Sequence, residues 1–233
     1  MCRSFEICER EGLLHVLREL SGGADVQLPD GVRAGGTALP GTFAPVIVSA
    51  SSGEGMGVPH ETATANELFP LEVREFGFGW PLEWKKESAF NARLDSLLQG
   101  KSPWNDALSH RRCILPCAAF YESHHTEKVA SPRTGKPVKR RYTFVSSDGS
   151  PLLLAAVYQG EFFSVVTTEP NPDVAAVHDR MPLVLTVEEA RRWLDADATL
   201  EWIVQLADRS VIRLASQGEG ETLPVITQPE LPL

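Results

Sequence analysis

Four separated stretches of the chain carry residue types that serve as nucleophiles, acids, bases or phosphate ligands. The first is the start, MCRSFEICER, where Cys2 directly follows the initiator methionine. Because cysteine is small enough to permit removal of Met1, Cys2 can become the N-terminal residue, with an α-amine and a thiol on adjacent carbons. These groups have ordinary pKa values of about 7.7–8.0 and about 8.5, so a neighbouring base can activate either one. On position alone, an incidental small residue is the simpler interpretation.

The second stretch is FNARLDS, residues 90–96, in which Asn91 and Arg93 lie two positions apart. On an extended strand, residues at this spacing share a face. An amide beside a guanidinium suits a polar ligand that carries a phosphate. The alternative is a turn asparagine beside a surface arginine.

The third stretch is RRCILPCAAFYES, residues 111–123, where Glu122 ends a long apolar run. A carboxylate at the end of a buried strand tends to have a raised pKa and can act as a general acid or base. The alternative is a solvated glutamate at a strand end. Cys113 and Cys117 share one face of the same strand, and core packing is the favoured role for both.

The fourth stretch is AVHDRMPLVL, residues 176–185, where His178 precedes Asp179 and Arg180 at the entrance to an apolar strand. Histidine is the natural proton shuttle near neutral pH, and its charged neighbours favour a site over a structural role. The adjacent pair His124 and His125 would point opposite ways on a strand, so we expect loop or groove residues there. No metal site is expected.

The remaining sequence predicts the elements that must position these residues. Hydrophobic periodicity and turn signals predict the following. Helices are expected at 9–20, at the end of 90–98, at 102–112 from Ser-Pro onward, after the capping box of Thr186 and Glu189, and within DATLEWIVQLA. Strands are expected at 43–50, 71–79 and 113–123, as an antiparallel meander of KRRYTFVSS, PLLLAAVYQG and EFFSVVTTE, and as two weak strands near 210–227. Loops are expected at 21–42 and 51–57. This order predicts one α+β domain over residues 1–233, with a curved, mainly antiparallel sheet and helices at its periphery.

Composition restricts the class of protein further. The chain has 233 residues, a net charge of −9 and 42% hydrophobic residues, which is ordinary for a globular protein. The charged, mixed N-terminus predicts no signal peptide, no apolar run is long enough for a membrane span, and four cysteines favour a reduced, cytosolic protein. The acidic balance argues against nonspecific coating of nucleic acid. The strip from Lys128 to Arg141 nevertheless carries six basic residues and no acidic one, so it can guide a polyanion locally. Its part from Arg133 to Arg141 can contact a nucleic-acid backbone or form a solvated hairpin tip.

Read together and in order, MC, FNARLDS, RRCILPCAAFYES and HDRMPLVL resemble the SRAP family, the SOS response-associated peptidases or abasic-site processing proteins. The resemblance covers most of the chain and fades after about residue 195. It implies a barrel-like SRAP fold and a covalent thiazolidine crosslink between Cys2 and abasic sites in single-stranded DNA.

The resemblance also implies roles for individual residues. Cys2, Asn91, Glu122 and His178 would form the catalytic set. The residues expected to contact DNA are Arg93, Arg3, Trp80, Trp84 and Arg180, with Phe78 as a further stacking candidate. The alternative for the three aromatic residues is a place in the core or in a hairpin. We expect no cofactor, no membrane partner, a monomer, and a cytoplasmic protein that joins the nucleoid on DNA damage.

The sequence departs from the family pattern at several positions. Arg3-Ser4 stands where Gly-Arg is usual, and Thr37 is nearest to an expected asparagine. Ala119 replaces a glycine and Ser123 a tryptophan. Two alternatives therefore stay open: an N-terminal cysteine hydrolase, which the peptidase label suggests, and a noncatalytic DNA-binding adaptor.

Overall fold

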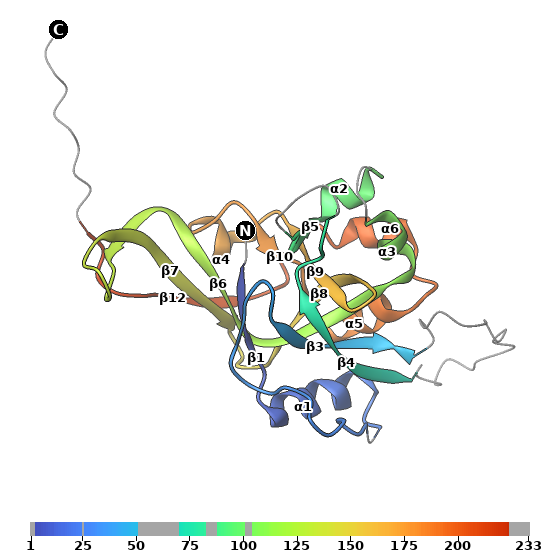
Figure 1. The fold of residues 1–233 in the computed structure, drawn as a ribbon. Coiled ribbons are helices and arrows are strands. Elements are labelled where there is room, and N and C mark those ends of the chain that lie inside the picture. The colour runs from blue at the N-terminus through green and yellow to red at the C-terminus, as the bar shows by residue number, and fades with distance from the viewer. Residues whose placement is uncertain (1–2, 25, 51–69, 83–87, 101–103, 224–233) are drawn as a thin grey trace, which may run out of the picture.

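The chain folds around a strongly curved sheet with its helices on the outside (Figure 1). The structure is a computed structural model that describes residues 3–24, 26–50, 70–82, 88–100 and 104–223. Its helices are α1 (Arg10–Leu20), α2 (Leu94–Leu98), α3 (Asn105–His110), α4 (Pro172–Ala175), α5 (Val187–Leu194) and α6 (Leu200–Gln205). Its strands are β1 (Ser4–Ile7), β2 (Thr37–Ala38), β3 (Phe43–Ser49), β4 (Leu71–Phe78), β5 (Asn91–Arg93), β6 (Arg112–Ala130), β7 (Pro137–Ser146), β8 (Leu152–Gln159), β9 (Phe162–Thr168), β10 (Met181–Pro182), β11 (Val184–Leu185) and β12 (Leu214–Gly218).

The sheet closes on itself. Strand β8 pairs with β9 on one side and with β6 on the other. Strand β9 continues in parallel to β4, β4 pairs antiparallel with β3, and β3 meets β6 where Ile47 lies opposite Ile114. These pairings return to the starting strand and form a barrel, which confirms the predicted α+β class with a curved, mainly antiparallel sheet.

Alternation along the strands divides the apolar residues between two cores. Leu115 and Leu154 point into the barrel beside Phe163, whereas Ile114 and Leu153 point outward. The outward residues are covered by α1 and α5, whose apolar faces follow the helical repeat. The barrel is therefore buried on both of its faces along these strands, and it provides a rigid base for side chains at its rim.

Strand β6 is much longer than the strand expected at 113–123. Its first part pairs with β8 inside the barrel, and its second part leaves the barrel to pair with β1 and β7. Figure 1 shows the resulting β6–β7 hairpin projecting from the body, with β12 beside it. Glu122 lies in the part of β6 that is leaving the barrel.

Local predictions were largely confirmed, whereas one long-range pairing was wrong. The helix at 9–20, the strands at 43–50 and 71–79, and the Thr186–Glu189 capping box all form. The predicted three-strand meander does not, because β7 pairs with β6 and β12, and only β8 and β9 pair as expected. The segments 51–57 and 101–103 lie outside the described residues. Among the described helices, none has the length and apolar character needed to cross a membrane.

Candidate active site

Glu122 is a buried carboxylate beside a histidine. Glu122 is only 4% exposed. It lies on β6 where this strand leaves the barrel wall, next to Phe120 and other buried apolar residues of the same strand. Its Oε2 lies 3.7 Å from Nε2 of His178. Burial raises the pKa of Glu122 to about 7. A carboxyl group with this pKa can take up or release a proton near neutral pH.

The loop after α4 fixes the orientation of His178. The backbone N–H of His178 donates to the carbonyl of Val174, which closes the last turn of that helix. The backbone N–H of Arg180 donates to Nδ1 of His178 at 3.1 Å. A neutral ring that accepts at Nδ1 carries its proton on Nε2, which is the nitrogen that faces Glu122.

Burial and a neighbouring carboxylate act on the pKa of His178 in opposite directions. Burial lowers the pKa of His178, whereas the Asp179 carboxylate, 3.0 Å from Nδ1, favours the protonated ring. The net direction is downward, so the neutral ring predominates near neutral pH. His178 and Glu122 thus form a contacting pair in which a neutral imidazole faces a carboxyl group whose pKa is raised to about 7.

A large bulge in β6 ties this strand to the His178 loop. Ser123 lies opposite Arg141 and Lys128 opposite Lys139, so the segment 124–127 faces a single residue of β7. Within the bulge, Nδ1 of His124 accepts the backbone N–H groups of residues 126 and 127. The backbone N–H of His125 donates to the carbonyl of residue 177, next to His178. The predicted loop histidines therefore form and anchor this bulge; among the described residues no cluster of three or more metal-ligating side chains occurs.

Arg180 ties the His178 loop to the end of β9 and to α2. Its side chain is 8% exposed and forms ion pairs with Glu169 at 2.8 Å and Asp95 at 3.4 Å. It also donates to the carbonyl of Thr167 at 2.9 Å. Asp95 in turn accepts two hydrogen bonds from Arg93, whose side chain stays half exposed. The placement of Arg180 argues against the predicted DNA contact, because its guanidinium is committed to the protein.

Arg3 contacts the aromatic ring of Phe90, the residue that precedes Asn91 in the chain. Asn91 opens β5 opposite Val165 of β9. The preceding residue, Phe90, has its ring 5.0 Å from the guanidinium carbon of Arg3. The described residues therefore link the NAR segment to the start of β1, while Cys2 itself lies outside them.

An open cavity of about 410 Å³ lies beside the first residue of β1, between β6, β7 and the His178 loop. It is lined by Arg3, Ser4, Tyr121, Glu122, Ser123, Lys139, Arg141 and His178. Three of the predicted site residues, Arg3, Glu122 and His178, thus meet in one cavity. Sequence reasoning missed Tyr121, Lys139 and Arg141 as lining residues; the basic strip was the available signal for the last two, but only the strand register shows which members face the cavity.

The predicted aromatic platform has a different placement. Trp80 is 7% exposed and packs edge-on against Trp104, with ring centroids 4.6 Å apart. Phe78 is completely buried in the barrel core against Phe163. Neither ring presents a face on which a base could stack, because both are covered by neighbouring side chains. Trp84 lies outside the described residues.

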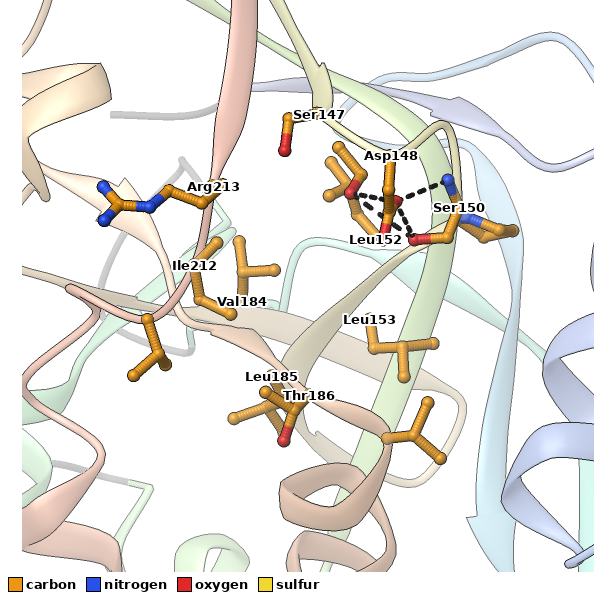
Figure 2. A pocket seen from close by; sticks show the side chains of 14 residues that line it. Ser147, Asp148, Ser150, Leu152, Leu153, Val184, Leu185, Thr186, Ile212 and Arg213 are labelled. Carbon is orange, nitrogen blue, oxygen red and sulfur yellow. Dashed lines mark hydrogen bonds between the residues drawn. The ribbon is translucent and has the colours of Figure 1, made fainter.

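A second cavity, of about 400 Å³, lies between the β7–β8 turn, the start of α5 and the segment before β12 (Figure 2). Its carboxylate, Asp148, accepts hydrogen bonds from the side chain and backbone of Ser150 and from the Ser146 hydroxyl. These bonds lower the pKa of Asp148 to about 2. The group stays ionised near neutral pH and cannot exchange protons there, so the first cavity is the candidate active site.

Comparison with known proteins identifies the family. The family described as SOS response associated peptidase (SRAP) matches residues 23–226. This chain belongs to the SRAP family. The SRAP match begins after the N-terminal segment and extends further toward the C-terminus than the motif resemblance does.

Curated relatives of this SRAP chain carry a common name. An "abasic site processing protein", YoqW of Bacillus subtilis, is 30% identical over 122 residues, which are 47% of this chain and 49% of the relative. YedK of Escherichia coli, with the same descriptive name, is 26% identical over 124 residues, half of each chain. The aligned part of this chain thus spans about half the length of the curated relatives it matches.

Solved structures show the same fold. A phage-related protein from Bordetella bronchiseptica superimposes with a TM-score of 0.64 at 18% identity, over 93% of both chains. A protein from Bacteroides thetaiotaomicron gives a TM-score of 0.64 at 17% identity, over 93% of this chain and 91% of the other.

Proposed function

We propose that this SRAP protein captures abasic sites in single-stranded DNA as a covalent crosslink through Cys2. The observation that carries the proposal is the buried Glu122, with its pKa raised to about 7, at 3.7 Å from His178 in an open cavity. Arg3, the residue after Cys2 in the chain, lines that same cavity. Relatives of the family named abasic site processing proteins support the same substrate.

The chemistry follows from the two nucleophiles of an N-terminal cysteine. An abasic sugar exchanges between a closed ring and an open aldehyde. Once Met1 is removed, the Cys2 α-amine attacks the aldehyde carbon, and the carbonyl oxygen leaves as water to give an imine. The thiol sulfur then adds to the imine carbon while its proton passes to the nitrogen, which closes a five-membered thiazolidine. Ring closure is intramolecular, and well-oriented cases reach effective molarities of about 10⁵ M or more.

The other residues assist this sequence of proton transfers. Glu122 takes a proton from the Cys2 amine and returns one to the departing oxygen, which a carboxyl group with a pKa near 7 can do in both directions. His178, with its Nε2 toward Glu122, assists opening of the sugar ring. Asn91 orients the sugar or the Cys2 backbone, and the half-exposed Arg93 holds a flanking phosphate. Single-stranded DNA is the favoured substrate because its lesion needs no unpairing.

A denaturing gel tests the proposal directly. Protein that mass spectrometry shows to lack Met1 is incubated with single-stranded DNA carrying one abasic site, and a shifted band is expected. The band should disappear in Cys2→Ala and with intact DNA, and Glu122→Gln should form it about 10²-fold more slowly. Cys8→Ala is the matched control, because Cys8 is buried and burial raises the pKa of its thiol to about 12, which leaves it unreactive.

The absence of a crosslinked band would contradict the proposal. Protein that lacks Met1 and gives no band has no crosslinking activity. Release of a peptide product without a band would instead favour the N-terminal hydrolase, and salt-sensitive binding without any covalent product would favour the noncatalytic adaptor.

A further inference from the structure

One face of the β6–β7 hairpin carries a line of cations that leads out of the candidate active site. Lys128 of β6 and Lys139 of β7 lie directly opposite each other, so their side chains share a face. Arg141 lies two residues along β7 from Lys139 and therefore points to the same side. We call Arg141, Lys139 and Lys128, together with Arg3 just before β1, the basic row.

The basic row is continuous with the reactive groups. Arg3, Arg141 and Lys139 line the same cavity as Glu122 and His178. The Lys128–Lys139 pair lies further out than the Ser123–Arg141 pair along the hairpin, which projects from the body of the protein (Figure 1). Side chains two residues apart on a strand are separated by about 7 Å. A strand of nucleic acid that leaves the cavity along this face would thus meet one cation after another.

The electrostatics of the row favour an anionic partner. Two lysines directly opposite on a sheet repel each other, which destabilises the hairpin unless an anion lies between them. In the described part of the chain, neither lysine forms an ion pair. The net charge of −9 does not cancel this effect, because at about 0.1 M salt charges act over only about 10 Å.

Arg141 is held in place but remains available. Its guanidinium carbon lies 3.7 Å from the ring centroid of Tyr121, which restricts its orientation. Tyr121 is itself fixed by donating a hydrogen bond to Glu6 at 2.9 Å. The carboxylate partner of Arg141 is Glu219 at 3.6 Å, in a pair whose side chains are 40% and 55% exposed. Such an exposed pair contributes little to stability, so a phosphate can replace the carboxylate at small cost.

The opposite face of the hairpin is built differently. Arg140, between Lys139 and Arg141 in sequence, forms an ion pair with Glu127 at 3.0 Å and contacts the Tyr142 ring. It also donates to the Thr222 hydroxyl. The basic strip of the sequence therefore divides into a structural cation and a solvent-facing row, which only the strand register reveals.

We infer that the basic row binds the phosphodiester backbone of the DNA strand on one side of the reacting nucleotide. The inference deepens the proposed function and rests on it for the identity of the polyanion. It also explains how the chain holds DNA with Ser4 at the position where the family resemblance leads us to expect arginine, because Arg3, Arg141 and Lys139 supply positive charge around the same cavity.

The salt dependence of binding to intact single-stranded DNA tests the inference. Each phosphate contact contributes about 0.7 to the slope of log K against log salt for a single strand. Fluorescence anisotropy with a labelled oligonucleotide should show the slope reduced by about 0.7 in Lys139→Ala and by about 1.4 in the double variant Lys128→Ala/Lys139→Ala. Arg18→Ala is the matched control, because Arg18 is an exposed cation in the last turn of α1, and its slope should equal that of the wild type.

Each outcome decides something about the row. Slopes that do not change in the lysine variants, or that change equally in Arg18→Ala, would overturn the inference even if crosslinking occurs. Reduced slopes in a protein that never crosslinks would support the row as a backbone-binding surface and count against the proposed function. Circular dichroism and thermal unfolding of each variant establish that the protein used is folded.

Discussion

Replacing Glu122 with glutamine tests the electrostatic state on which the proposed chemistry depends. Glutamine has nearly the same size and shape, so the buried site keeps its packing while its ionisation is removed. Burial raises the pKa of Glu122 from 4.5 to about 7. Between these values the folded protein retains a proton that the unfolded chain has released. The stability contributed by this proton is therefore fully present below about pH 4.5 and is lost as pH rises toward about 7.

The size of the effect follows from the two pKa values. Their difference, at about 1.36 kcal/mol for each pH unit, corresponds to about 3 kcal/mol of unfolding free energy. Glutamine has no such dependence, so the stability of Glu122→Gln relative to the wild type should increase by about 3 kcal/mol between pH 4 and pH 8. Titratable groups away from the site have the same surroundings in both proteins, so their contributions largely cancel in this comparison.

Urea unfolding of both proteins at a series of pH values measures this difference. The same variant should crosslink about 10²-fold more slowly at pH 7, so stability and reactivity should change in opposite directions. A stability difference that stays constant from pH 4 to pH 8 would refute the reasoning, because Glu122 would then titrate alike in the folded and unfolded chain. It could not be the group that exchanges protons near neutral pH.

Two further predictions concern residues around the site. Trp80→Ala should lower the unfolding free energy by about 3–5 kcal/mol in urea titrations, as expected for a buried tryptophan. The Kd of this variant for single-stranded DNA should change less than about twofold. A Kd raised about tenfold or more would instead reveal base stacking. Asp95→Asn removes the carboxylate shared by Arg93 and Arg180. Since the Asp95 side chain is 44% exposed, we expect a loss of at most about 1 kcal/mol in thermal unfolding, together with slower crosslinking through Cys2. Wild-type crosslinking in this variant would show that the Asp95 link does not position the His178 loop.

The parts of the fold that depend on neighbouring residues were readable from the sequence. The capping box of Thr186 and Glu189 needs only a four-residue window, and the helix at 9–20 needs only its apolar spacing. The core role favoured for Cys113 and Cys117 agrees with the structure, where both are completely buried in the inner core. These features are local, because one element or one face determines them.

The features that sequence reasoning missed depend on pairing between distant segments. Nothing in the sequence near Lys139 shows that β7 pairs with β6 rather than with β8. This pairing brings Lys139 and Arg141 to the cavity, on the face of β7 opposite Arg140. Trp80 is a base-stacking candidate on sequence alone, because an aromatic residue near a turn can equally be exposed or buried; Trp104, which covers it, lies in another segment of the chain. The motifs identified which residues belong together, and tertiary pairing determined their surroundings.

The pairing of β1 with β6 has a consequence for when the site comes into existence during synthesis. Ser4 lies opposite Tyr121, so the two sides of the cavity are separated by more than a hundred residues of chain. At about 5–20 residues per second on the ribosome, roughly 6 to 24 seconds pass between them. A nascent chain therefore holds no assembled Glu122–His178 cavity around its first residues until β6 and the loop after α4 have been made. The proposed nucleophile, Cys2, and its proposed proton-transferring partners are therefore completed at different times, and the proposed crosslinking has to wait until the barrel has formed.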